Sequence, residues 1–403
     1  MKYFFLIGEA SGDLHASHLI EAIKQQDPAA SFSGFGGDKM AAAGCTLYRH
    51  IRDLAFMGFV AVLKNISTIR QNFAIAKQAL LDEQPDVLVL VDYPSFNLKM
   101  AKFARQHLPS LQIVYYIPPK VWAWKQWRRK TILQLCDQVL CIFPFEPAFY
   151  LDPSQPPLKG AEKRAQVVYV GNPTAEECLS AQRSFSDSGP TAQRSKIIAL
   201  LPGSRRSEIK HCLPKMLAAA RRFPDYEIRI AQAPSIPTAF YEQILSTLNS
   251  TLSTTLNSTL STLNYDLLCK SEVAIVNSGT ATLEAALLGC PEVAVYHIAL
   301  PHLAGLIWKA VFTIRHFTLP NIILDLRDEQ GKPKEVIREL IAYLFTVDNI
   351  EAEVKRLLTD NEYRQTMLQH FDELRTLLGD QPVASVAARY ITKLAKPAKL
   401  VKP

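Results

Sequence analysis

The stretch 200–205 (LLPGSR) has the residue types of a loop that binds phosphate. It ends the apolar run 196–201, which we expect to form a buried parallel strand. Gly203 lets the backbone approach a ligand closely, and Arg205, after Ser204, supplies a planar cation whose N–H groups match pyrophosphate oxygens. An ordinary turn with a surface arginine is the alternative, because one glycine turn is weak evidence by itself.

A second loop of this kind, 277–291 (NSGTATLEAALLGCP), follows the apolar run 272–277. Ser278, Gly279 and Thr280 stand where a helix should begin, so backbone N–H groups and the positive end of the helix dipole would face a phosphate. Glu284, just inside that helix, could accept hydrogen bonds from ribose hydroxyls, although it could also only complement the helix dipole. Two such loops in one half of the chain favour a nucleoside diphosphate as the ligand.

Asp92 is the candidate catalytic residue in the first half of the chain. It ends the very apolar run 86–92 (DVLVLVD) and is followed by Tyr93 and Pro94. Partial burial would bring the pKa of its carboxyl nearer to the working pH, which suits a general base that removes a proton from a sugar hydroxyl. A cap of the following helix is the alternative.

The first apolar run of the chain leads into the loop 8–13 (GEASGD). Its glycines permit a tight turn from a strand into a helix, and Glu9, Ser11 and Asp13 would present polar groups to a ligand. The loop lacks the pattern GxGxxG, which counts against a dinucleotide site. A simple capping turn is the alternative.

Two further segments suggest contact with a lipid. The run 115–132 sets tryptophans beside cations, which suits a lipid headgroup, a sugar face or a phosphate, and its candidates are Trp122, Trp124, Arg128 and Arg129. The run 56–70 is typical of an amphipathic helix at a membrane surface, with candidates Phe59, Val60, Val62, Leu63 and Ile66. Packing into the protein core is the alternative for both segments.

These residues must be positioned by the elements around them. Short apolar runs alternate with helical periods, at residues 3–8, 32–37, 86–92, 112–117, 138–143, 166–171, 196–201, 226–231, 272–277 and 292–297. This order predicts an α/β fold with two doubly wound, Rossmann-like parallel sheets, whose ligands bind at the carboxyl ends of the strands in a cleft between the domains.

The domain boundaries follow from composition. We expect an N-terminal domain at 1–175, a polar linker at 176–195 and a C-terminal domain at 196–374, with the C-terminal helices of 375–403 packing back on the first domain. The segment 245–264 is a repeat rich in Leu, Ser and Thr. Its leucines recur at helical spacing, so we expect an extended amphipathic helix there, in an insertion.

The composition is that of a globular enzyme, with 48% hydrophobic and 21% charged residues. The net charge of +7 is compatible with anionic lipid surfaces or phosphorylated substrates and does not by itself argue for nucleic acid. Seven cysteines without CxxC spacing suggest free thiols in a reducing compartment, the cytoplasm. No signal peptide or membrane-spanning run is expected.

Neither a metal nor another cofactor is expected. The chain has no Asp-x-Asp triplet of the sort that holds a divalent ion. Its nine histidines show no spacing typical of metal ligands.

The order of these motifs resembles that of the bacterial lipid-A-disaccharide synthases, a family of GT-B glycosyltransferases. The motifs extend over most of the chain: 8–13 (GEASGD), 34–45 (GFGGDKMAAAGC), 56–63 (FMGFVAVL), 92–97 (DYPSFN), 119–124 (PKVWAW), 143–146 (FPFE), 170–173 (VGNP), 200–205 (LLPGSR), 278–284 (SGTATLE) and 319–321 (LPN). Their number and order make the resemblance specific.

The resemblance implies a reaction of lipid A biosynthesis. A diacylglucosamine unit passes with inversion from UDP-2,3-diacylglucosamine to 2,3-diacylglucosamine 1-phosphate, which yields a β-1,6-linked tetraacyl disaccharide 1-phosphate and UDP. Asp92 matches the base of the family, and Arg205, Glu284 and Asn321 match positions that contact UDP. Glu9, Ser11 and Asp13 match a functionally sensitive loop.

The sequence departs from the family pattern at two positions. Pro118 stands where a serine is expected, which puts a role for a hydroxyl there in doubt. Ser95 replaces a second carboxylate of some members, which argues against a mechanism with paired carboxylates.

The resemblance also implies a location and partners. Because both substrates carry acyl chains, the protein should attach to phospholipids on the cytoplasmic face of the inner membrane of a Gram-negative bacterium without crossing it. A homodimer is a further option. Two other functions stay open: another GT-B enzyme that acts on a UDP-sugar, such as a UDP-sugar 2-epimerase, and a non-catalytic peripheral membrane protein that binds a nucleotide sugar.

Overall fold

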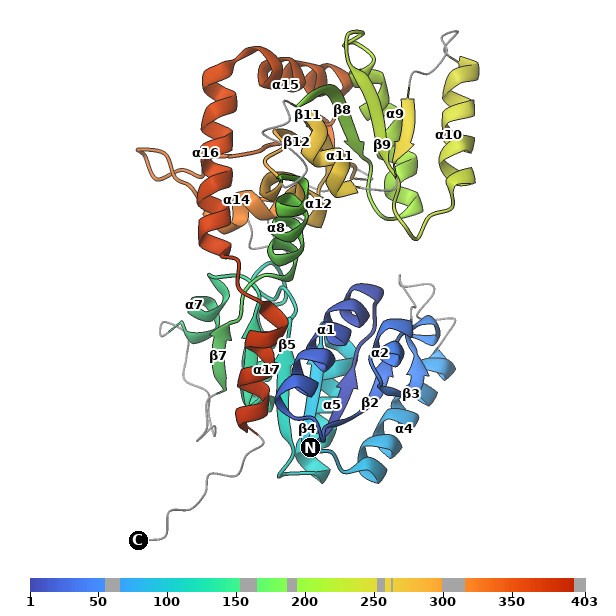
Figure 1. Cartoon of the computed structure of the whole chain (residues 1–403), viewed down its shortest axis with the longest axis vertical. Coiled ribbons are helices and arrows are strands. Elements are labelled where there is room, and N and C mark those ends of the chain that lie inside the picture. Colours follow the sequence, from blue (N-terminus) through green and yellow to red (C-terminus); the bar gives the residue numbers. More distant parts are fainter. Residues whose placement is uncertain are drawn as a thin grey trace. The chain divides into compact units, whose positions relative to one another are not determined.

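The computed structural model of the chain describes residues 1–54, 66–152, 165–186, 194–251, 258–261, 264–298 and 316–394. The chain divides into two compact units (Figure 1). The first unit consists of Met1–Pro173 and Gln381–Pro403, and the second consists of Thr174–Asp380. The C-terminal segment therefore returns to the first unit after the second is complete.

The first unit contains a parallel sheet that, within the described ranges, has the strand order β3-β2-β1-β4-β5-β6-β7. Its strands are β1 (Lys2–Leu6), β2 (Ser31–Gly36), β3 (Thr46–His50), β4 (Val87–Val91), β5 (Gln112–Tyr116), β6 (Gln138–Cys141) and β7 (Gln166–Tyr169). Its helices are α1 (Ala10–Gln26), α2 (Asp38–Ala42), η1 (Ile51–Asp53), α4 (Ile66–Glu83), α5 (Pro94–His107), α6 (Arg128–Leu135), α7 (Glu146–Leu151) and α17 (Val383–Leu394).

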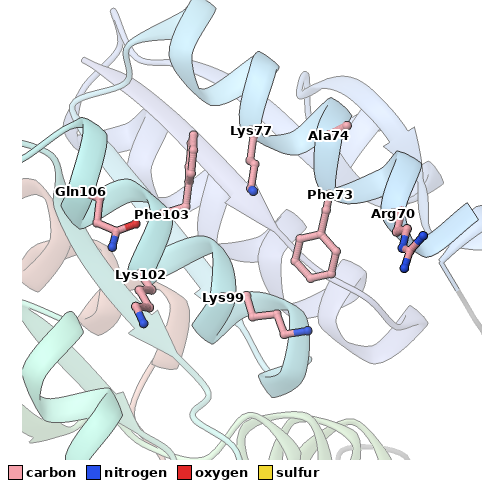
Figure 2. Close-up of a pocket in the computed structure, with 8 residues that line it drawn as sticks. All are labelled: Arg70, Phe73, Ala74, Lys77, Lys99, Lys102, Phe103 and Gln106. Atoms are coloured by element: carbon pink, nitrogen blue, oxygen red, sulfur yellow. The ribbon is translucent and has the colours of Figure 1, made fainter. Parts of the chain in front are cut away.

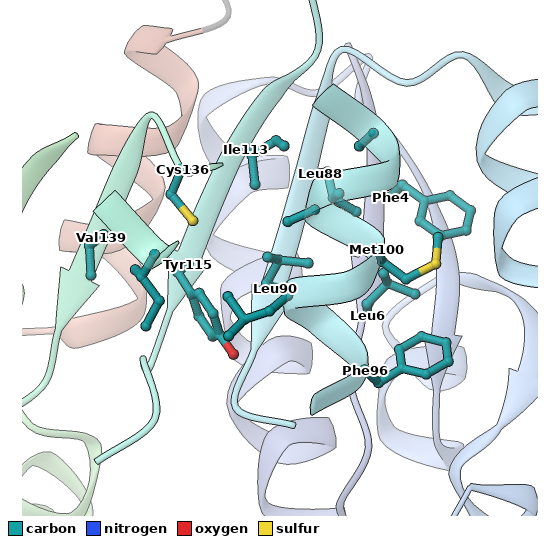
Figure 3. Close-up of a cluster of buried hydrophobic side chains, with 14 of the residues drawn as sticks. Phe4, Leu6, Leu88, Leu90, Phe96, Met100, Ile113, Tyr115, Cys136 and Val139 are labelled. Carbon is teal, nitrogen blue, oxygen red and sulfur yellow. The ribbon is translucent and has the colours of Figure 1, made fainter. Parts of the chain in front are cut away.

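The core of the first unit lies on both faces of this sheet, because successive side chains of a strand point to opposite faces. Tyr3 and Phe5 of β1 pack on one face with α1, α2 and α17. Phe4 and Leu6 pack on the other face with α4, α5 and α6, as Figure 3 shows. Helix α17 lies beside α1 and contributes buried side chains such as Ile391, so the end of the chain completes this core.

The second unit is built in the same way around a parallel sheet whose described strands have the order β10-β9-β8-β11-β12-β13. The strands are β8 (Ser195–Leu201), β9 (Glu227–Ala231), β10 (Ser258–Ser261), β11 (Ser271–Asn277), β12 (Glu292–Tyr296) and β13 (Arg338–Ile341). The helices are α8 (Pro173–Ser186), α9 (Arg206–Ala220), α10 (Thr238–Thr251), α11 (Asn264–Lys270), α12 (Thr280–Leu287), α14 (Leu319–Leu324), η2 (Ala342–Leu344), α15 (Val347–Thr359) and α16 (Asn361–Leu378).

Strand order places the candidate residues at two points where a ligand is expected. In the first sheet β1 lies next to β4, and in the second β8 lies next to β11. At each of these pairs the order of the strands reverses, and the loops that leave such strands diverge and open a site at the carboxyl edge of the sheet. The loop 8–13 and Asp92 follow the first pair, and the loops with Gly203 and Gly279 follow the second.

All ten predicted strands are present, with small shifts at their ends, and the α/β prediction is confirmed. The strands β3, β10 and β13 were not predicted. They are short and lie at or near sheet edges, where the apolar signal is weak. The seven cysteines are free thiols, as predicted.

Two predictions about irregular regions are wrong in part. The expected linker 176–195 begins instead inside α8, whose Ala175 and Cys178 are fully buried and whose start at Pro173 favours a helix. The repeat 245–264 is not one extended helix, because α10 ends at Thr251 and Ser258–Ser261 pairs with β9 as a parallel strand. Ser and Thr have low helix propensity, and Thr favours strands.

Candidate active site

Asp92 occupies a strained turn at the end of β4. Asp92 and Tyr93 both have a φ of 43°, in the left-handed region that side chains other than glycine rarely adopt. Such conformations cost on the order of 1–3 kcal/mol each and persist only where surrounding contacts enforce them. The two residues carry α5 away from the sheet, since the helix begins immediately afterwards at Pro94.

The contacts that enforce this turn come from Asn97 and Tyr115. Asn97 is fully buried, and its amide nitrogen lies 2.8 Å from the carbonyl oxygen of Asp92 and 3.2 Å from those of Leu6 and Val91. The Tyr115 hydroxyl donates to the same Asp92 carbonyl at 2.6 Å. These hydrogen bonds therefore fix the backbone of Asp92. They also fix the point at the carboxyl edge of the sheet from which its side chain extends.

Charge and burial tune the carboxylate of Asp92. Partial burial raises the pKa of its carboxyl, and the negative charge of Glu9 raises this pKa further. The positive charge of Lys120 and a hydrogen bond from the Tyr93 N–H act in the opposite direction. The predicted effect of burial on this pKa is thus confirmed, and a raised pKa suits a general base.

Lys120 is linked to a second buried acid that the sequence did not single out. Glu146 is fully buried at the start of α7 and accepts hydrogen bonds from the Trp122 indole N–H at 3.0 Å and from two backbone N–H groups. Burial raises the pKa of the Glu146 carboxyl to about 7. Desolvation lowers the pKa of Lys120, while the charges of Glu146 and Asp92 raise it. Lys120 and Trp122 belong to the motif PKVWAW, and Glu146 belongs to FPFE. The positions of these motifs after β5 and β6 were the sequence signal that could have identified the three residues.

The three candidates of the N-terminal loop divide into two groups. Glu9 and Ser11 are exposed at the start of α1, and the Glu9 side chain caps nothing there. Asp13 is buried, and its carboxylate accepts hydrogen bonds from the N–H groups of Gly37, Lys39 and Met40. Its oxygens cap the N-terminus of α2 and fix that helix against α1, and its expected role at a ligand stays a prediction.

The four candidates of the tryptophan-rich segment likewise include buried and more exposed side chains. Trp122 is 6% exposed and bound to Glu146, and Arg129 is 7% exposed and donates to the carbonyl oxygens of Tyr150 and Asp152. Both side chains bind within the interior of the unit, and their contact with a lipid or acceptor stays a prediction. Trp124 is 43% exposed, and the half-buried Arg128 donates to the Ser95 hydroxyl at 3.2 Å.

The remaining membrane candidates come from the run 56–70. Phe59, Val60, Val62 and Leu63 lie outside the described residues, and so does the side chain of Ile66 at the start of α4.

In the second unit, a glutamate side chain occupies the backbone N–H groups of the loop after β8. Gly203 has a φ of 115°, and a Cβ atom there would lie 2.6 Å from a carboxylate oxygen of Glu208, so a side chain does not fit. Glu208 accepts hydrogen bonds from the N–H groups of Ser204 and Arg205 and pairs with the Arg205 guanidinium at 3.0 Å. The expected free N–H groups are therefore occupied in this conformation, although the guanidinium is largely exposed.

The loop after β11 has the open helix N-terminus that was predicted. Ser278 is used internally, because its N–H donates to Val295 and its hydroxyl donates to the Phe317 carbonyl oxygen. The N–H groups of Gly279 and Thr280, at the start of α12, have no protein acceptor among the residues that the structure describes. This end of α12 can thus bind an anion.

Glu284 lies within α12, and Asn321 lies in α14, which packs against α12. Burial raises the pKa of the Glu284 carboxyl to about 7, and the nearby charge of Glu177 adds to the effect. Asn321 is 1% exposed, and its amide donates to Ile337 and Glu339 while its oxygen accepts from Val336 and Ile337. These hydrogen bonds join α14 to the segment that leads into β13, and a direct contact of Asn321 with UDP stays a prediction.

Comparison with known sequences agrees with this geometry. The sequence model of the family described as "Lipid-A-disaccharide synthetase" matches residues 3–391. A lipid-A-disaccharide synthase of Trichlorobacter lovleyi is 33% identical over 94% of this chain and 93% of its own length. One of Myxococcus xanthus is 33% identical over 99% of each chain.

Comparison with solved structures shows the fold. A UDP-GlcNAc 2-epimerase from Neisseria meningitidis bound to UDP-GlcNAc matches 98% of this chain and 100% of its own with a TM-score of 0.62 and 13% identity. A glycosyltransferase from Rickettsia africae matches 98% of this chain and 97% of its own with a TM-score of 0.51 and 11% identity. Both likenesses agree with the GT-B fold that the two parallel sheets indicate.

The sequence comparisons separate the alternatives that the fold leaves open. The epimerase shares the architecture at 13% identity, whereas the two synthases share a third of their residues over nearly their whole length. The family model likewise spans both units, including the loop 8–13, Asp92 and both glycine loops. The chain belongs to the lipid-A-disaccharide synthetase family.

Proposed function

We propose that the chain transfers a diacylglucosamine unit from UDP-2,3-diacylglucosamine to the 6-hydroxyl of 2,3-diacylglucosamine 1-phosphate. The products are the β-1,6-linked tetraacyl disaccharide 1-phosphate and UDP. The observation that carries this proposal is the carboxylate of Asp92, which is held on an enforced turn at the carboxyl edge of a sheet and has a raised pKa. Membership of the family supports the choice of substrates.

In the proposed mechanism, the first unit supplies the base. Asp92 accepts the proton of the acceptor 6-hydroxyl while that oxygen attacks the anomeric carbon of the donor. The bond between the anomeric carbon and the UDP oxygen breaks, and its electron pair leaves with UDP. One direct displacement inverts the anomeric centre, which turns the α-linked donor sugar into a β-linked product. Lys120 favours the ionised form of Asp92, and Glu9 opposes it.

The second unit holds the nucleotide in this mechanism. The N–H groups of Gly279 and Thr280 at the start of α12 and the cation of Arg205 stabilise the charge that develops on the departing pyrophosphate. A pyrophosphate oxygen would take the place of the Glu208 carboxylate at the loop with Gly203, since both are anionic acceptors for the same N–H groups. Glu284 binds the ribose hydroxyls.

The acyl chains of both substrates lead us to propose that the protein works at the cytoplasmic face of the inner membrane, with phospholipids as partners and with a homodimer as one assembly. No helix among the described residues is long and apolar enough to cross a bilayer. Neither a metal nor another cofactor takes part in the proposed reaction, because helix N-terminus and guanidinium supply the positive charge.

Product analysis tests this function. Purified protein is incubated with both substrates in detergent, and UDP and the disaccharide are quantified by mass spectrometry. We expect equal amounts of the two products, with the same rate in EDTA. UDP binding without disaccharide would refute the proposal, and a loss of activity in EDTA that magnesium restores would refute its metal-free form.

The substitution Asp92→Asn tests the base. It keeps the size of the side chain and removes its ability to take a proton, so we expect turnover to fall by about 10²–10⁴-fold. UDP affinity, measured by calorimetry, should be unchanged, because the nucleotide loops belong to the second unit. Turnover equal to that of the parent protein would exclude Asp92 as the base.

The pH dependence of kcat/KM tests how Asp92 is tuned. Asp92 must be ionised to accept a proton, so the rate falls as the pH drops through its raised pKa. Glu9→Gln removes a charge that raises this pKa and should move the acidic limb to lower pH. Lys120→Met removes a charge that lowers it and should move the same limb to higher pH.

Matched controls for these two variants are Glu21→Gln on α1 and Lys130→Met on α6, which change the same charges at exposed positions. Neither control should move the limb. Shifts of Glu9→Gln and Lys120→Met in the same direction would contradict the proposed tuning.

The substitution Arg205→Ala tests the pyrophosphate contact. A charge-assisted hydrogen bond to phosphate is lost, so Kd for UDP should rise by about 10–100-fold. Arg206→Ala is the control, because it removes an equal charge from the next residue, whose guanidinium packs over the Phe240 ring. Equal effects of the two substitutions would show that only net charge matters.

A further inference from the structure

A groove lies between α4 and α5 of the first unit, and none of its lining residues is assigned to the reaction. Its volume is about 560 Å³, and it is open to solvent. Arg70, Phe73 and Lys77 line it from α4, and Lys99, Lys102 and Phe103 line it from α5. Figure 2 shows the side chains of Phe73 and Lys77 directed from one helix toward the other.

The groove is strongly positive. Four of its lining residues are cations, and none of the eight described residues around it is acidic. Within the described part of the chain, none of these four cations pairs with a carboxylate. Arg105, on another face of α5, does have such a partner, because it binds Asp137 at 2.5 Å. The charge of the groove is thus uncompensated, unlike that of its neighbour on the same helix.

Two aromatic rings hold the lysines across the groove. The ammonium of Lys77 on α4 lies 5.0 Å from the ring centre of Phe103 on α5. The ammonium of Lys99 on α5 lies 5.3 Å from the ring centre of Phe73 on α4. These reciprocal cation–π contacts direct both charges into the groove, above an apolar floor. A ligand with a phosphate next to an apolar body fits this arrangement.

The groove is connected to the catalytic turn by stacked rings. Phe73 stacks on Phe96 with their ring centres 4.3 Å apart, and Phe96 stacks on Tyr93 with a separation of 5.3 Å. Tyr93 is the second residue of the enforced turn and follows Asp92 directly. An occupant of the groove would therefore lie against the helix that starts at the base.

We propose that this groove binds the phosphate of an anionic membrane phospholipid. This inference rests on the proposed function, in which both substrates are delivered from a bilayer. Uncompensated lysines attract the anionic phosphates at a membrane surface, and the phenylalanine rings contact the glycerol and first methylenes. The sequence immediately before α4, residues 55–65 (AFMGFVAVLKN), is largely apolar, which is the composition of a membrane contact.

The test uses the full chain and a triple variant, Lys77→Gln, Lys99→Gln and Lys102→Gln. Vesicles of equal parts phosphatidylcholine and phosphatidylglycerol are sedimented with each protein, and the bound fraction gives the partition coefficient. We expect the triple variant to bind on the order of 100-fold more weakly than the parent. Salt should weaken binding of the parent, because the Debye length falls from about 10 Å at 0.1 M to about 3 Å at 1 M.

Matched variants separate the groove from net charge. Lys332→Gln, Lys334→Gln and Lys355→Gln together remove the same charge from exposed positions of the second unit and should leave vesicle binding unchanged. Replacement of the three groove lysines by arginine should restore binding. Thermal unfolding of every variant shows whether it is folded. Equal loss of binding in both glutamine variants, or unchanged binding in the groove variant, would overturn the proposal.

Two further measurements exclude other ligands. Disaccharide synthesis in detergent by the groove variant should proceed with the KM of the parent, and a raised KM for the acceptor alone would reassign the groove to the acceptor phosphate. Glycerol 3-phosphate, tested by calorimetry, should bind far more weakly than vesicles, and equal affinity would reassign the groove to soluble phosphates. Vesicle binding does not require turnover, so a protein that binds vesicles but forms no disaccharide would refute only the proposed function.

Discussion

The proposed chemistry depends on the contact between the buried amide of Asn97 and the carbonyl oxygen of Asp92. Two successive residues in the left-handed region cannot hold their conformation unaided, and Asn97 and Tyr115 hold it through hydrogen bonds to the Asp92 carbonyl oxygen. The same turn ends β4, starts α5 and aims the carboxylate of Asp92. The strained turn thereby gives the proposed base a fixed position, where burial and the charge of Glu9 raise its pKa.

The two units use the same architecture for different proposed roles. Each has a parallel sheet in which the strand order reverses between two adjacent central strands, and the candidate loops follow those strands. The first unit uses that point to fix a carboxylate and surrounds it with the charges of Glu9 and Lys120. The second uses it for two helix starts and an arginine, one start open and the other closed by Glu208. The proposed base chemistry and phosphate binding thus depend on strand order and on the residues of these loops.

The sequence was informative where chemistry follows an apolar strand directly. Asp92, Gly203 and Gly279 each follow such a strand, so their positions could be predicted from the alternation alone. Whether a polar side chain faces a ligand or the interior depends on tertiary contacts. The sequence therefore did not show that Asp13, Arg129 and Asn321 bind backbone groups. It also missed Glu146, whose burial is set by the loops after β5 and β6. The prediction of one extended helix for the Ser- and Thr-rich repeat was wrong for a local reason, because Ser and Thr have a weak preference for helix.

Turnover of the variant Asn97→Ala, compared with that of Asn72→Ala, tests the central claim most directly. Both asparagines are buried in the first unit and donate to backbone carbonyls, but only Asn97 holds the Asp92 turn. The account predicts that the two variants lose similar stability and keep UDP affinity, while turnover falls at least about tenfold further in Asn97→Ala, since misplacement of a reacting group is costly. Equal turnover of the two folded variants would contradict it.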